Sequence, residues 1–117
     1  MNELNLLQRV IPDAFFVKQN NMLHKVKVDE VLWIKAEGNY SIIYTLSKKY
    51  ILKLSLKKIL NQLPGNYFKQ IQRAYIIALT KIDDIDMGTN EVIIQKTRLP
   101  LGRNYREDLM SSLRILK

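Results

Sequence analysis

Residues 31–40 read VLWIKAEGNY and carry the clearest strand and turn signals of the chain. The first four of them form a compact apolar run, which is typical of a buried strand. Gly38 and Asn39 are turn-forming residues, and residues 40–46 beyond them are rich in β-branched and aromatic side chains that favour strands. The pattern predicts two strands joined by a tight turn at residues 38–39.

Weaker signals of the same kind lie on both sides of this unit. Residues 14–18 form another strand-like run, residues 20–21 are a turn signal, and residues 23–28 alternate apolar with polar side chains. On the other side, a polar turn at residues 47–49 leads the chain back into the β-rich residues 50–54. The first half of the chain is therefore predicted to be a series of short strands.

The hydrophobic period changes after residue 55 and predicts a central helix. Four apolar side chains have the spacing of one helical face: Leu56, Ile59, Leu60 and Leu63. Ser55 has the character of an N-cap, and Pro64 with Gly65 that of a helix stop. We expect the apolar face to lie in the core.

The C-terminal third predicts one hairpin and a second helix. Residues 82–85 and 91–95 flank a turn-rich segment and read as a hairpin. The last helix is expected to begin near Asn104, because Glu107 follows at the spacing of a capping box. Its buried face is predicted to consist of Tyr105, Leu109, Leu113 and Leu116.

The order of these elements decides the fold class. Strands do not alternate with helices, so a parallel sheet is excluded as the main architecture. We therefore predict a mainly β fold of small antiparallel sheets with one central and one C-terminal helix. Residues 1–13 are interpreted as a linker or N-terminal arm, and residues 14–117 as one domain.

The net charge of +8 is concentrated in one segment. Residues 38–82 contain no Asp or Glu but eight Lys or Arg, whereas the remaining residues hold 11 basic and 11 acidic side chains. Such a segment generates a positive field that attracts a polyanion. Composition alone leaves a solvated lysine surface as an equal alternative.

The residue inventory gives little support for catalysis or metal binding. The chain has no cysteine, which excludes thiol nucleophiles, disulfides and zinc–thiolate sites. Phosphate-binding loops, dinucleotide fingerprints and nucleophile elbows are missing. His24 has no second ligand beside it, and the acidic cluster of Asp83, Asp84 and Asp86 lacks the spacing of a calcium loop. We therefore expect no enzyme, no metal site and no cofactor.

The same inventory suits a cytoplasmic protein. No segment approaches the roughly 18 apolar residues of a membrane span, and the first residues lack the pattern of a signal peptide. The absence of cysteine is compatible with a reducing compartment. We expect a cytoplasmic location and no membrane contact.

Three polar or basic segments lie next to predicted element ends, where functional loops are commonly found. They are residues 37–40 (EGNY), residues 69–73 (KQIQR) and residues 102–104 (GRN). With their surroundings, these segments resemble the LytTR family of bacterial DNA-binding domains. The similar stretches are VLWIKAEGNY at 31–40, YILKLSL at 50–56, FKQIQRAYII at 68–77 and LPLGRNY at 99–105. Their order and spacing make the resemblance specific, and it covers roughly residues 14 to 115.

The resemblance implies an elongated β fold whose loops, and not a recognition helix, enter the major groove of promoter DNA. It implies base or phosphate contacts by Asn39, Tyr40, Arg73 and Arg103. Arginine can bind guanine and asparagine can bind adenine through two hydrogen bonds each. We add as candidates for attraction of the DNA backbone the lysines Lys35, Lys48, Lys49, Lys53, Lys57, Lys58 and Lys69.

The resemblance also implies the setting of the domain. Members are output domains of two-component response regulators, and they bind repeated sites as dimers. A receiver domain would either precede residue 1 in a longer protein or be missing from this regulator. The chain departs from the family pattern at Gln72, Ala74, Ala78 and Gly102, which leaves the target sequence open.

Two other functions are compatible with the residues. A small β-barrel that binds single-stranded nucleic acid could use exposed tyrosines as stacking faces, although their apolar neighbours favour core packing. A protein-interaction domain with a basic surface is the other alternative. For Arg73 and Arg103, structural salt bridges are the alternative to DNA contact.

Overall fold

The computed structural model of the protein describes residues 14–117, and the predicted arm at residues 1–13 lies outside them. The strands are β1 (Ala14–Gln19), β2 (Met22–Lys27), β3 (Val31–Glu37), β4 (Tyr40–Thr45), β5 (Lys49–Leu52), β6 (Phe68–Gln72), β7 (Tyr75–Ala78), β8 (Asp84–Asp86), β9 (Glu91–Ile94) and β10 (Thr97–Pro100). The helices are α2 (Leu56–Gln62) and α3 (Arg103–Ser111), with 3-10 turns η1 (Val28–Glu30) and η2 (Leu79–Lys81). No helix in this part of the chain has the length and apolar character needed to cross a membrane.

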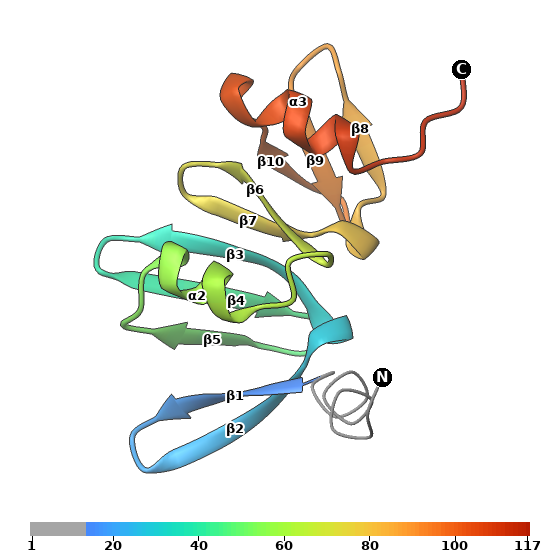
Figure 1. The fold of residues 1–117 in the computed structure, drawn as a ribbon. Helices are drawn as coiled ribbons and strands as arrows, with labels where there is room; N and C mark the ends of the chain where they lie inside the picture. The colour runs from blue at the N-terminus through green and yellow to red at the C-terminus, as the bar shows by residue number, and fades with distance from the viewer. Residues whose placement is uncertain (1–13) are drawn as a thin grey trace, which may run out of the picture.

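The strands form three antiparallel sheets. The central sheet has five strands in the order β5-β4-β3-β7-β6, a three-stranded sheet has the order β10-β9-β8, and β1 pairs with β2. In Figure 1 the sheets follow one another from the blue β1–β2 hairpin, through the central sheet, to the orange β8–β10 sheet. The predicted mainly β class, with small antiparallel sheets and two helices, is confirmed.

The β3–β4 hairpin at the middle of the central sheet forms as the sequence predicts. Glu37 pairs with Tyr40, which leaves Gly38 and Asn39 as a two-residue turn. Gly38 has a φ of 60°, a left-handed conformation that glycine adopts without steric cost. The turn therefore depends on a residue that lacks a Cβ atom.

The central sheet separates two hydrophobic clusters. Helix α2 packs in the first cluster with Ile34, Ile43 and Ile76, and its Ser55 hydroxyl accepts the predicted capping bond from the Lys58 amide. The second cluster lies between the other face of the sheet, the β8–β10 sheet and α3, and contains Leu32, Ile71, Ile77, Val92, Ile94, Leu99, Leu101 and Leu109. Val17 of β1 and Val26 of β2 also lie in the first cluster, so both small sheets pack against the central sheet.

The C-terminal helix differs from the prediction. Its N-cap is Gly102 and no side chain caps it, so the expected capping box at Asn104 and Glu107 does not form. The helix ends at Ser111, where the Ser111 and Ser112 hydroxyls donate to the carbonyl of Asp108 and compete with further helical bonds. Leu113 and Leu116 therefore lie beyond the helix, and Leu116 is 90% exposed.

Candidate nucleic-acid interface

The first of the three predicted loops is the β3–β4 turn. Asn39 and Tyr40 are both exposed, and 49% of the Tyr40 surface is open to solvent. The tight pairing of Glu37 with Tyr40 holds the turn at the end of two central strands. Both side chains are therefore available to a ligand on a rigid support.

The second loop is the β6–β7 turn, which carries the exposed Arg73. The Gln70 side-chain amide donates to the Arg73 carbonyl over 3.1 Å. The Ala74 amide donates to the Gln72 side-chain oxygen over 2.7 Å. Two glutamine side chains therefore stabilise the turn on both sides of Arg73.

The third loop is the junction of β10 and α3, which carries the exposed Arg103. The Gly102 amide donates to the Ile71 carbonyl over 2.7 Å. A Cβ atom on Gly102 would lie only 3.0 Å from Cδ2 of Tyr105. A serine at this position, as in the family pattern, would therefore require the Tyr105 ring to shift by a few tenths of an ångström.

Backbone hydrogen bonds connect the three loops. Besides the Gly102–Ile71 bond, the Ala36 amide donates to the Ala74 carbonyl over 2.8 Å, which ties the β6–β7 turn to β3. Figure 1 shows the β3–β4 and β6–β7 turns at the same edge of the molecule, with the start of α3 on that side. The structure therefore brings the loops of Asn39, Arg73 and Arg103 together.

A fourth turn, which is not one of the three predicted loops, lies on the same side. The β1–β2 turn at Asn20 and Asn21 points the same way in Figure 1. Asn20 has a positive φ of 56°, and both asparagines are exposed. Residues 20–21 carry a turn signal in the sequence, but only the arrangement of the sheets reveals the position of this turn.

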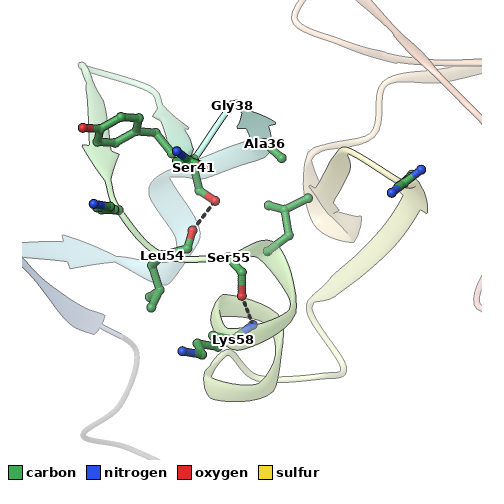
Figure 2. Close-up of a pocket in the computed structure, with 11 residues that line it drawn as sticks. Ala36, Gly38, Ser41, Leu54, Ser55 and Lys58 are labelled. Carbon is green, nitrogen blue, oxygen red and sulfur yellow. Dashed lines mark hydrogen bonds between the residues drawn. The ribbon is translucent and has the colours of Figure 1, made fainter.

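A hollow of about 410 Å³ adjoins the first two loops. Its lining includes Lys53, Lys58 and Arg73, and it contains no carboxylate. Figure 2 shows its floor, where the Ser41 hydroxyl donates to the Leu54 carbonyl over 2.6 Å and Ser55 caps α2. A concave surface with three cations and no acidic group is suited to an anion such as phosphate.

The remaining lysines of the predicted set are either engaged within the protein or not grouped with the loops. Lys69 forms an ion pair with Asp108 at 3.3 Å, and the Lys35 ammonium lies 5.8 Å from the Tyr75 ring centre. Lys48 and Lys49 lie at the β4–β5 turn, which is at the opposite end of β4 from Asn39. Lys57 is exposed on α2. The structure thus groups Lys53 and Lys58 with the loops, and places Lys48 and Lys49 away from them.

The geometry bears on two alternatives to duplex DNA contact, namely salt bridges of Arg73 and Arg103 and a barrel that binds single-stranded nucleic acid. Within residues 14–117, Arg73 and Arg103 form no salt bridge. The central sheet is open, with β5 and β6 at its edges, so residues 14–117 do not form the barrel of the single-stranded alternative. Tyr50 is buried and Tyr44 stacks on Trp33 with ring centres 4.9 Å apart.

The acidic cluster serves the β8–β9 hairpin. Asp86 accepts hydrogen bonds from the Gly88 and Thr89 amides and forms an ion pair with Arg98, as Glu91 does. The Thr89 amide and then Arg98 hold the pKa of the Asp86 carboxyl below its usual value. The Thr89 hydroxyl and Arg98 do the same to the pKa of Glu91. These carboxylates therefore stabilise the β8–β9 hairpin and the adjoining strand β10.

The fold defines the class first: a small, mainly β domain that displays linked polar loops along one edge. The family model described as the LytTr DNA-binding domain matches residues 21–114, and the chain belongs to this family. The LytTr DNA-binding domain of a methyl-accepting/DNA response regulator from Bacillus cereus has the same fold, with a TM-score of 0.73 and 17% identity over 85% of this chain and 94% of that one.

Curated relatives extend the comparison to whole regulators. A response regulatory protein of Vibrio cholerae is 31% identical over 88% of this chain and 44% of its own length. The transcriptional regulatory protein LytR of Staphylococcus aureus is 23% identical over 86% of this chain and 42% of its own. YpdB of Escherichia coli, another transcriptional regulatory protein, is 20% identical over 74% of this chain and 39% of its own length. The chain therefore spans less than half of the length of these proteins.

Proposed function

We propose that this domain binds duplex promoter DNA in a sequence-specific way, through loops that enter the major groove. The observation that carries the proposal is the grouping of Asn39, Arg73 and Arg103 on three hydrogen-bonded loops at one edge. These residues are exposed, and their side chains are the types that bind adenine and guanine edges. A rigid support for such side chains is what base recognition requires.

Different residues are assigned different tasks. Asn39, Arg73 and Arg103 are assigned to bases or to the phosphates beside them, and Tyr40 packs against the DNA next to Asn39. Lys53 and Lys58, which line the hollow, are assigned to the DNA backbone. The exposed Asn20 and Asn21 of the β1–β2 turn extend the surface along the same edge.

The relatives suggest the setting in which the domain works. Their names identify response regulatory and transcriptional regulatory proteins, and the chain matches less than half of each. We therefore infer that this domain is the output part of a bacterial transcription regulator in the cytoplasm. A receiver domain on the same polypeptide and a dimer on repeated sites complete the proposal.

Selection of binding sites from random duplex DNA tests the function. The expected result is a defined site whose affinity falls with salt, with a slope of roughly 0.9 per phosphate neutralised in a plot of log affinity against log salt. The single strands of that site should compete poorly against the duplex. Equal competition by single strands, or enrichment of no sequence, would contradict the proposal.

A further inference from the structure

We propose that the β6–β7 turn is a joint that sets the positions of all three loops, with Gln70 and Gln72 as positioning residues that act through Arg73. This inference rests on the proposed DNA-binding function. It concerns two side chains that are half-buried and are engaged within the protein.

The two glutamine side chains form hydrogen bonds with the same peptide group. The Arg73 carbonyl and the Ala74 amide belong to the same peptide group. Its carbonyl oxygen accepts from the Gln70 side chain over 3.1 Å, and its N–H donates to the Gln72 side chain over 2.7 Å. Because a peptide group is planar, fixing both of its ends fixes the rotation of the backbone after Arg73. The direction in which the Arg73 side chain leaves the turn is set by that rotation.

A β-bulge connects this turn to the third loop. The β6–β7 register shifts between Gln70 and Gln72, and a bulge re-aims the backbone groups of the extra residue. Here the extra residue is Ile71, whose side chain is fully buried and whose carbonyl accepts the Gly102 amide over 2.7 Å. Arg103 follows Gly102 directly, so its position depends on the bulge.

The other side of the turn connects to the first loop. The Ala74 carbonyl accepts the Ala36 amide over 2.8 Å, and Gly38 is two residues further along the chain. A rotation of the turn would therefore be transmitted to Asn39 as well as to Arg103. The joint explains how loops from separate hairpins can keep a fixed spacing, which binding to one DNA site demands.

A comparison of two Gln72 variants tests the joint. Gln72→Met keeps the length of the side chain but removes the acceptor, whereas Gln72→Asn retains an oxygen that can accept from the amide two residues on. We expect Gln72→Met to weaken binding to the selected site about tenfold, the equivalent of one hydrogen bond. We expect Gln72→Asn to restore most of that affinity. Non-specific DNA affinity and its salt slope should stay unchanged for both.

A double-mutant cycle with Arg73→Ala separates positioning from direct contact. If Gln72 acts mainly through Arg73, Gln72→Met should cause a clearly smaller loss in the Arg73→Ala background than in the parent, the remainder coming from the loops of Asn39 and Arg103. An equal loss in both backgrounds would show that Gln72 does not act through Arg73 and would overturn the proposal. Unchanged affinity of Gln72→Met would also overturn it. The same holds if Gln72→Met loses affinity together with melting temperature and Gln72→Asn recovers neither. If the parent selects no duplex site, the proposed function fails instead.

The link to the third loop has its own matched pair. Gly102 has a φ of −69°, which proline also adopts, so Gly102→Pro breaks the link without a conflict at φ: it removes the amide donor and places its ring carbon against the Ile71 carbonyl. Gly102→Ala adds a Cβ atom but keeps the donor. We expect Gly102→Pro to bind the selected site more weakly than Gly102→Ala when Arg103 is present. After Arg103→Ala, the two variants should bind equally. Equal binding by the two variants would overturn this half of the joint.

Discussion

Replacing Gly38 by alanine tests whether the β3–β4 turn depends on a left-handed residue. An added Cβ atom would meet no atom within 4 Å, so a steric clash with the rest of the protein is excluded. The remaining cost is that of holding alanine at a φ of 60°, about 1–2 kcal/mol. We expect the free energy of unfolding to fall by about that amount.

Thermal unfolding measures this cost directly. For a domain of this size, 1 kcal/mol corresponds to a decrease in melting temperature of about 4–8 °C. The variant should also bind the selected DNA site more weakly than the parent, because Asn39 and Tyr40 are displayed by this turn. Both effects follow from one backbone angle.

Gly65→Ala is the matched control. A Cβ atom on Gly65 also meets nothing within 4 Å, but Gly65 does not have a left-handed φ. Alanine there restricts the unfolded chain and should leave stability equal or raise it by about 0.4–1 kcal/mol. If both variants lost the same stability, or if Gly38→Ala lost none, the explanation of the turn would be refuted.

Three further predictions concern capping, pH and the DNA backbone. Ser55→Ala should lower the free energy of unfolding by about 1 kcal/mol, because the hydroxyl caps the Lys58 amide, and chemical denaturation measures the loss. The lowered pKa values of Asp86 and Glu91 predict a stability contribution that is present above about pH 4.5 and is lost as the pH falls through the folded-state values. Melting temperatures from pH 7 to 3 should show this loss in the parent and a smaller one in Arg98→Met. Lys53→Ala and Lys58→Ala should each reduce the salt slope of DNA binding by roughly 0.9, whereas Lys48→Ala and Lys49→Ala should leave it unchanged.

The parts of the fold that follow local rules could be predicted from the sequence. The turn at Gly38, the helix capped by Ser55 and the turn between β8 and β9 all depend on neighbours in the chain. The end of α3 could not be predicted in this way. Leu113 and Leu116 continue the helical spacing, but Ser111 and Ser112 bind the Asp108 carbonyl and the helix stops.

The candidate site was predicted in its residues but not in its connections. Asn39, Arg73 and Arg103 stand in recognisable motifs, and each lies on an exposed loop. The bulge at Ile71 and the glutamine contacts depend on pairing between β6 and β7, which has no local signal in residues 68–72. The charge count likewise could not separate Lys53, which lines the hollow, from Lys48 at the far end of β4.

The affinity of arginine variants for the selected duplex tests the central claim most directly. Arg73→Ala and Arg103→Ala are each expected to weaken specific binding by roughly 1–3 kcal/mol without lowering the melting temperature. Arg114 is also exposed but lies beyond α3, so Arg114→Ala loses the same charge away from the loops and should change the affinity little. Equal losses in all three variants, or none in the first two, would contradict the assignment of the loops to DNA recognition.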